Sequence, residues 1–156
     1  MTDEDESPGS DTEAATDGVV EETAEPDGDV PTDGDAIGET RWRFPGGFVP
    51  VDSTGPEPAM VSHDRLCVLN AGDSMASVEL TLYYEGGRVA GPYPLTVAAA
   101  RVRHVRINDL IDPYAPPLGE AYGCVVESTV PVVVQVSRQD TRRTENATLS
   151  TIAYRE

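Results

Sequence analysis

Residues 76–87, ASVELTLYYEGG, contain the pattern that decides the fold class. Apolar and aromatic side chains occupy every second position of this stretch, at Val78, Leu80, Leu82 and Tyr84. A period of two sends successive side chains to opposite faces, which is typical of a half-buried β-strand. The Glu-Gly-Gly sequence that ends the stretch predicts a turn. We therefore expect one strand here, with a second strand close behind it.

Similar short runs lie on both sides of this strand. They are RLCVLNAGD (65–73), residues 88–97, ARVRHVRI (100–107), CVVEST (124–129), PVVVQVSR (131–138) and ATLSTIAY (147–154). No segment shows a sustained period of 3.6, and Gly or Pro turns separate the runs at roughly ten-residue spacing. This pattern predicts an all-β domain, a single β-sandwich of the jelly-roll kind or a barrel.

The sequence also gives four local expectations. RWRFPGGFVP (41–50) places aromatic residues around a Pro-Gly-Gly turn, and residues 129–131 join two separate strands. The imperfect alternation of residues 100–107 indicates a bulge or a twist into a sheet edge. Residues 108–113 predict one helical turn, capped by Asn108 and stopped by Pro113.

The net charge of −17 is concentrated at the N-terminus. Residues 1–40 hold 15 carboxylates and no Lys or Arg, whereas residues 41–156 hold 13 acidic and 11 basic side chains. Residues 1–38 cannot bury enough apolar area to offset the entropy of ordering, so we expect a disordered acidic tail before a domain at 39–156. The net charge excludes a nucleic-acid binder driven by overall charge, the two cysteines exclude a disulfide scaffold, and the length of 156 residues excludes a multi-domain enzyme. The use of Arg alone, with no Lys, together with the acidic tail suggests a salt-loving source.

The cellular setting follows from what the sequence lacks. Nothing at the start reads as a signal peptide, and no run approaches 18 apolar residues, so we expect a cytoplasmic protein without a membrane span. Cys67 and Cys124 both lie in apolar, strand-like runs. Two buried free thiols in a reducing compartment are the favoured interpretation, and a disulfide across two facing sheets is the alternative.

Catalytic groups are sparse. Ser62, His63 and Asp64 are adjacent, but neighbours along an extended chain point to opposite sides and cannot form a relay among themselves. Asp109 and Asp112 make at most a weak metal site, because no His or third acid lies near them in the sequence. We therefore expect no catalytic residues, no metal site and no cofactor.

Positive charge is more informative, because six of the eleven Arg lie in two short windows. If those strands are neighbours, they form a mixed polar surface for carboxylates or phosphates. The candidate partner-binding residues are Arg101, Arg103, Arg106, Asn108 and Asp109 on one segment, and Arg138, Asp140, Arg142, Glu145 and Asn146 on the other. The alternatives are internal pairing with Asp109, Asp140 and Glu145, or an oligomer interface.

From residue 55 onward the chain resembles the sensory rhodopsin transducer family, over about 110 domain residues. The matching segments are GPEPAMVSHDRLCVLNAGD (55–73), VELTLYY (78–84), GPYPLTV (91–97), RHVRINDLIDP (103–113) and STVPVVVQVSRQDTRRTENATLSTIAY (128–154), with TRWRFPGGFVP (40–50) matching more loosely. The resemblance implies a jelly-roll-like β-sandwich that assembles as a cyclic homotetramer.

The resemblance also implies a function. A member of this family would bind the cytoplasmic face of a microbial rhodopsin and relay its light state as a non-enzymatic adaptor. Two alternatives stay open: a small-molecule or carbohydrate-binding module, and a DNA-binding regulator that uses the Arg surface. For the carbohydrate alternative, the candidate stacking residues are Trp42, Tyr83, Tyr93 and Tyr114.

Overall fold

The computed structural model describes residues 36–57, 60–143 and 147–155, and nearly all of its regular structure is β-strand. The strands are β1 (Glu39–Phe48), β2 (His63–Asn70), β3 (Ala76–Tyr84), β4 (Val89–Val97), β5 (Arg101–Arg106), β6 (Ala121–Asp140), β7 (Ala147–Ile152) and β8 (Tyr154–Arg155), with one 3-10 turn, η1 (Ile107–Asp109). The all-β class predicted from the alternating pattern is confirmed. The acidic segment expected to be disordered lies, up to residue 35, outside the described residues.

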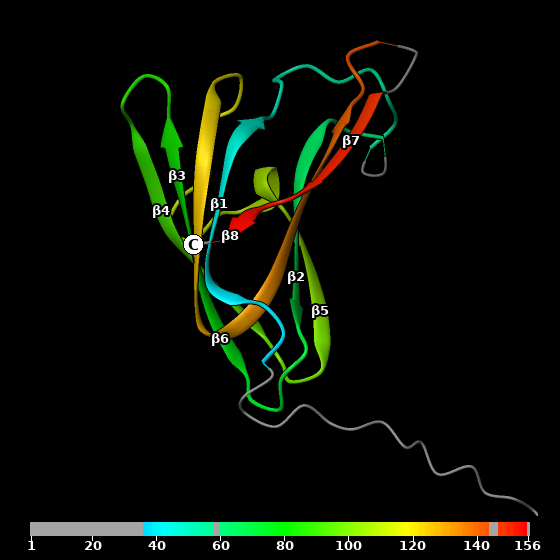
Figure 1. Cartoon of the computed structure of the whole chain (residues 1–156). Helices are drawn as coiled ribbons and strands as arrows, with labels where there is room; N and C mark the ends of the chain where they lie inside the picture. The colour runs from blue at the N-terminus through cyan, green and yellow to red at the C-terminus, as the bar shows by residue number, and fades with distance from the viewer. Residues whose placement is uncertain (1–35, 58–59, 144–146, 156) are drawn as a thin grey trace, which may run out of the picture. The chain divides into compact units, whose positions relative to one another are not determined.

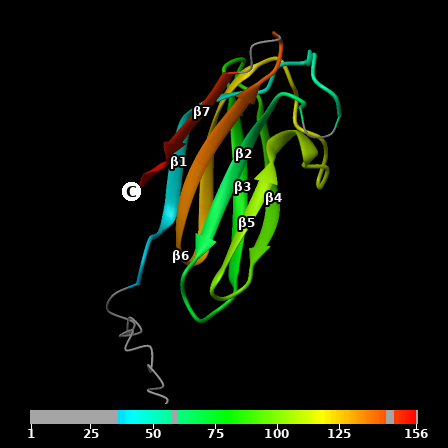
Figure 2. The same ribbon diagram turned by 90° about the vertical axis from the view of Figure 1, so that its right-hand side faces the viewer.

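Two antiparallel layers face each other and share the long strand β6 (Figure 1). One layer has the strand order β4-β3-β6-β1-β8. In the other layer β2 lies between β5 and the second half of β6, and β7 pairs with the far side of that half. Figure 2 shows β5, β2 and β6 side by side in this second layer. The expected sandwich is therefore present, with β6 connecting its layers.

The expectation of two separate strands around residues 129–131 is wrong, because β6 is continuous through them. Its first half pairs with β3 up to Ser128, and its second half pairs with β2 from Val133. Pro131 lies between these two pairings, where the strand passes from one layer to the other. A proline lacks the N–H that a sheet interior requires. Because Pro131 lies between the two pairings, no ladder hydrogen bond is lost there.

The Pro-Gly-Gly turn expected in residues 41–50 is also absent, because β1 runs through this sequence as a bulged strand. The register with β6 shifts between Phe44 and Gly47. At Gly47 a Cβ atom would lie 2.1 Å from Cε2 of the Tyr122 ring, so only glycine fits there. The close approach of that ring explains the glycine at this position of the strand.

The core lies between the layers and is built by the alternation that the sequence shows. Val78, Leu80 and Leu82 are at most 1% exposed, and Tyr84 is 5% exposed. Trp42 packs into the same core and donates its Nε1–H to the Val132 carbonyl oxygen at 2.8 Å. Each fully buried side chain of this size contributes roughly 1.5–3 kcal/mol by leaving water, so the hydrophobic alternation accounts for the layer arrangement.

The region between β5 and β6 corrects one further expectation. The helical turn is the single 3-10 turn η1, which ends at Asp109 rather than beside Pro113. Asn108 lies inside the turn instead of capping it, and its Oδ1 is buried without a hydrogen-bond partner. Along β5 the register with β2 has no shift, so the strand's irregular pattern reflects its edge position rather than a bulge.

Candidate docking surface

β5 carries three of the predicted site residues, and two of them lie on the inner side of its layer. Arg101 and Arg103 lie opposite Asn70 and Val68 of β2, both buried, and so face the inner side of the layer. Because β5 is the edge strand, these side chains reach past the core rather than into it. Arg103 donates from Nη1 to the Thr96 carbonyl oxygen of β4 at 2.8 Å, which connects the edges of the two layers.

A groove of about 340 Å³ lies beside β5, between it, β4 and the segment after η1. It combines positive, negative and apolar side chains along one side of the sandwich. The groove is lined by Pro94, Leu95, Arg103, His104, Val105, Arg106, Asp109, Leu110, Ile111 and Asp112. Ile111 is 77% exposed, which is unusual for a large aliphatic side chain. Three predicted site residues thus share this groove: Arg103, Arg106 and Asp109.

Arg138 of the second predicted segment has a structural role. Its Nε and Nη2 donate to the two carboxylate oxygens of Asp64 at 2.7 and 3.0 Å. Nη2 also donates to the Gly46 carbonyl oxygen at 2.7 Å. The Asp64 carboxylate is fully buried and also accepts the hydroxyl of Tyr122 at 2.7 Å. Arg138 is therefore held by internal pairing, and its partner is Asp64 rather than any acid considered from the sequence.

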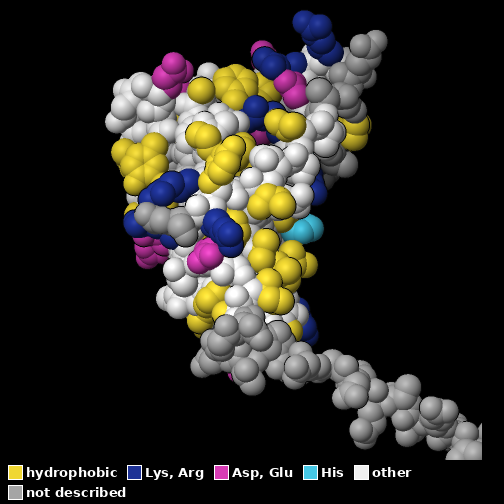
Figure 3. All heavy atoms as spheres, viewed as in Figure 1, with side chains coloured by type: hydrophobic (Ala, Val, Ile, Leu, Met, Phe, Trp, Pro, Cys, Tyr) yellow, Lys and Arg dark blue, Asp and Glu magenta, His cyan; other side chains and the backbone are white. Residues whose placement is uncertain are grey.

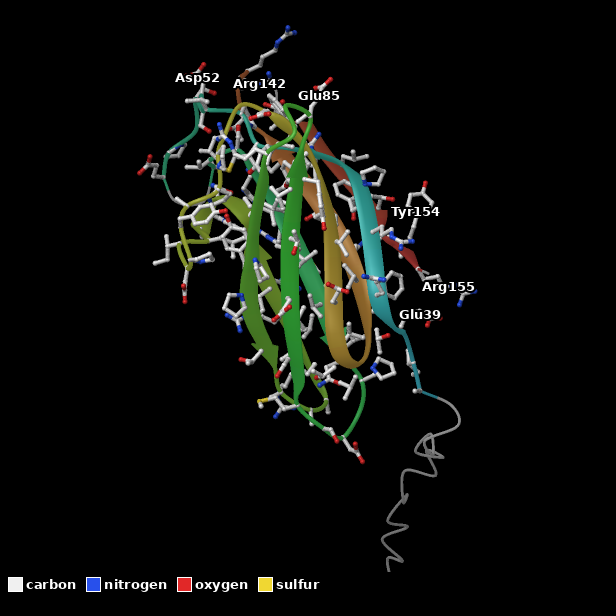
Figure 4. The ribbon with its side chains drawn as sticks, turned by 90° about the vertical axis from the view of Figure 1, so that its left-hand side faces the viewer. Glu39, Asp52, Glu85, Arg142, Tyr154 and Arg155 are labelled. Atoms are coloured by element: carbon white, nitrogen blue, oxygen red, sulfur yellow. The ribbon has the colours of Figure 1, made fainter. Side chains whose placement is uncertain are left out.

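Asp140 and Arg142 form a second, exposed pair. Arg142 Nη2 lies 2.6 Å from Asp140 Oδ2, and its guanidinium is 5.7 Å from the centre of the Phe48 ring. The Arg142 hydrogen bond lowers the pKa of the Asp140 carboxyl below its usual value. Figure 4 shows Arg142 and Asp52 at the opposite end of the domain from Glu39. Glu145 and Asn146, the last two predicted site residues, lie outside the described residues.

The two predicted segments are not adjacent, because β2 separates them. Arg65 of β2 lies opposite Arg106 on one side and Ser137 of β6 on the other. The expected single surface thus divides into the β5 groove and a separate pair at Asp140 and Arg142. The sequence analysis did not single out Arg65, although its place in the SHDRLCV motif beside His63 was visible.

His63 is a buried hydrogen-bonding residue and not part of a relay. It is 2% exposed, and its Nδ1 lies 2.8 Å from the Val61 carbonyl oxygen. Nε2 accepts from Arg65 Nη2 at 3.2 Å, since a guanidinium only donates, so Nδ1 carries the proton. Burial lowers the pKa of His63 below 6.5, and the positive charges of Arg106 and Arg65 act in the same direction. Ser62 hydrogen-bonds Thr141, and Asp64 bonds Arg138, so the three adjacent polar residues have separate partners.

An apolar strip lies on the outer side of the second layer. Leu69 lies opposite both Val102 of β5 and Val133 of β6, so the three side chains share one face. Leu69 is 41% and Val102 56% exposed, and Ile152 of the adjacent β7 is 64% exposed. Figure 3 shows hydrophobic side chains on the neighbouring side of the sandwich, where β7 and β8 lie. We call Leu69, Val102, Val133 and Ile152 the apolar strip.

The remaining sequence candidates are divided between core and surface. Trp42 and Tyr93 belong to the core, whereas Tyr83 and Tyr114 are half exposed. Cys67 and Cys124 are free thiols; Cys124 is buried as expected, whereas Cys67 is only half-buried. Within the described ranges, no group of three His, Cys, Asp or Glu side chains is placed to hold a metal ion. None of the helical structure there has the length and hydropathy of a transmembrane helix.

These features define a β-sandwich whose β5 groove and apolar strip suit contact with other molecules. The family model of Anabaena sensory rhodopsin transducer matches residues 37–155, and the chain belongs to this family. A solved structure of Anabaena sensory rhodopsin transducer is 48% identical, with 65% of this chain and 97% of that chain covered and a TM-score of 0.59. A crystal structure of Thermotoga maritima 1070 is 31% identical, with 76% and 96% covered and a TM-score of 0.66. No curated protein matches the chain.

Proposed function

We propose that this protein is a non-enzymatic signalling adaptor that binds a membrane photoreceptor of the sensory rhodopsin type in the cytoplasm. The observation that carries the proposal is the 48% identity with Anabaena sensory rhodopsin transducer over 97% of that chain. The separate partners of Ser62, His63 and Asp64 support a role other than hydrolysis. The protein's task is then to bind and to report the state of its partner.

The proposed docking surface is the part of the predicted site that lies on β5 and η1. Arg101, Arg103 and Arg106 belong to this surface, with Asn108 and Asp109 beside them. Arg138 is excluded from it, since its guanidinium is engaged with Asp64. The apolar strip gives the protein a second, chemically different surface, and we assign it to assembly of the chain with copies of itself into a homotetramer.

The direct test measures binding of the full chain to a sensory rhodopsin in lipid nanodiscs, in the dark and under illumination. The variant Arg101→Gln with Arg103→Gln is expected to lose at least tenfold in affinity. Its matched control, Arg142→Gln with Arg143→Gln, removes the same charge at the other end of the domain and is expected to bind like the wild type. Equal binding by both variants would remove β5 from the proposed surface.

The same variants test DNA binding as the alternative function. Three Arg and no acid within the six residues of β5 are the observation that favours it. A regulator of this kind would bind duplex DNA with an affinity that falls steeply with salt, because phosphate contacts release counterions. Salt-dependent DNA binding that is lost in Arg101→Gln with Arg103→Gln, without rhodopsin binding, would replace the adaptor function.

A further inference from the structure

β5 has an unpaired backbone edge. Within the described residues it pairs only with β2, and β4, the edge of the facing layer, pairs only with β3. Figures 1 and 2 show β5 at the border of its layer with no strand beyond it. In such a strand every second residue directs its N–H and C=O away from the sheet. These groups are a template for an additional strand.

The charges on this edge select the kind of strand that fits. Arg101 and Arg103 each donate from Nη1 to a backbone carbonyl oxygen, that of Ala100 at 2.9 Å and that of Thr96 at 2.8 Å. None of the ion pairs among the described residues involves either of them. Each guanidinium has five N–H donors, so donors remain for a carboxylate.

The groove beside the edge limits the binding partner further. Arg103 and Arg106 give it positive charge, Asp109 and Asp112 give it negative charge, and exposed Ile111 adds an apolar wall. The two carboxylates would repel the evenly spaced phosphates of a nucleic acid or an anionic bilayer. An extended peptide can instead place its carboxylates at Arg101 and Arg103 and an apolar side chain against Ile111.

We propose that β5 binds an extended, acidic segment of a partner protein as an additional strand, with carboxylates of that segment on Arg101 and Arg103. The inference rests on the proposed docking function of β5 and specifies its binding partner. Cytoplasmic loops of membrane proteins are rich in Lys and Arg, which β5 would repel. The complementary element of a membrane partner is therefore an acidic segment. Six residues of strand span about 20 Å, the length of peptide that the edge accommodates.

The test uses the full chain and the hexapeptide Ac-Glu-Val-Glu-Val-Glu-Val-amide as the probe, with binding followed by amide chemical shifts. We expect binding in the micromolar to millimolar range, new hydrogen-exchange protection in β5, and at least tenfold weaker binding by Arg101→Gln with Arg103→Gln. The Gln-for-Glu peptide is expected to bind at least tenfold more weakly. The control chain Arg142→Gln with Arg143→Gln keeps its affinity.

Backbone N-methylation separates strand addition from charge attraction. Two versions of the peptide carry N-methyl groups at the odd or the even positions. Strand addition predicts that only one version loses binding, because alternate N–H groups face β5. Equal binding of both versions, or equal binding by the Arg101→Gln, Arg103→Gln chain, overturns the proposal. Preference for vesicles with anionic lipids over the peptide also overturns it.

The outcome is distinguishable from failure of the adaptor function. If the Arg variant loses rhodopsin binding while the peptide never binds, the docking function of β5 stands and strand addition is wrong. If the peptide binds as expected but no rhodopsin does, β5 is a peptide-binding edge with a different partner.

Discussion

Asp64 and Arg138 form a two-point ion pair, with Nε–Oδ1 and Nη2–Oδ2 distances of 2.7 and 3.0 Å, 74 residues apart in the sequence. The pair joins β2 to the second half of β6, and the Tyr122 hydroxyl on the first half donates to the same carboxylate. Phe48 of β1 adds its backbone N–H at 2.9 Å. One buried carboxylate thus connects three strands and both layers.

Replacing Arg138 with Met is expected to destabilise the domain by about 3 kcal/mol or more, because the buried Asp64 charge loses its partner. Urea unfolding of the full chain measures the change in the free energy of unfolding. Arg142→Met is the control, since that side chain is exposed and its loss should change little. The double variant Asp64→Leu with Arg138→Met should recover part of the loss, and a further loss there would contradict the explanation.

Lowering the pH below about 6.5 is expected to destabilise the domain through His63. Burial lowers the pKa of His63 below 6.5, so between its folded pKa and 6.5 the unfolded chain binds the additional proton. The stability from neutral His63 is present above pH 6.5 and is lost as the pH falls toward the folded pKa. In the variant His63→Gln the thermal midpoint should fall less between pH 7 and pH 5 than it does in the wild type. The exposed His104→Gln serves as the control, and an unchanged slope in His63→Gln would contradict the prediction.

The two thiols are expected to differ in reactivity. Burial, followed by the nearby Asp64 charge, raises the pKa of Cys124 to about 12, so its thiolate is absent at pH 8. Cys67 is half-buried, and burial raises the pKa of its thiol as well. In the native chain an aromatic disulfide reagent should therefore react slowly, and only with Cys67. In guanidinium chloride it should react with both thiols. The native reaction should disappear in Cys67→Ser and persist in Cys124→Ser.

The sequence predicted those features of the fold that depend on a short local pattern. The alternation at Val78, Leu80 and Leu82 identified a half-buried strand, and the structure confirms it. Pro131 misled because its usual effect is to end a strand, whereas here it occupies the point where β6 changes layers. That position depends on the pairing of distant strands, which no short window contains.

The candidate site shows the same limit. Three Arg in β5 were found from local sequence, and their edge position agrees with the strand's irregular alternation. Arg138 was assigned to the surface because its partner Asp64 is distant in sequence and joins it only through the pairing of β2 with β6. The apolar strip was missed because its four members come from four different strands, and only the pairing of β2, β5, β6 and β7 brings them to one face.

The last prediction concerns the apolar strip. Exposed apolar patches of this kind mark interaction surfaces, and we assign this one to the proposed homotetramer. Leu69→Asp and Ile152→Asp each place a charge on the strip, which desolvation would penalise in an interface. Light scattering at tens of micromolar should show a tetramer for the wild type and smaller species for both variants. Val89→Asp is the control, because Val89 is 52% exposed but lies opposite Tyr83 in the other layer.

Because all three positions are exposed, the variants should fold. If the dissociated chains keep the wild-type thermal midpoint, general unfolding is excluded as the cause of dissociation. A wild-type monomer, or dissociation by Val89→Asp alone, would show that the strip does not mediate assembly.

The β5 groove supplies an independent comparison. If Arg101→Gln with Arg103→Gln also dissociates the tetramer, β5 is part of the interface, and its loss of rhodopsin binding would follow from lost assembly. If that variant stays tetrameric, assembly and docking use separate faces of the same sandwich.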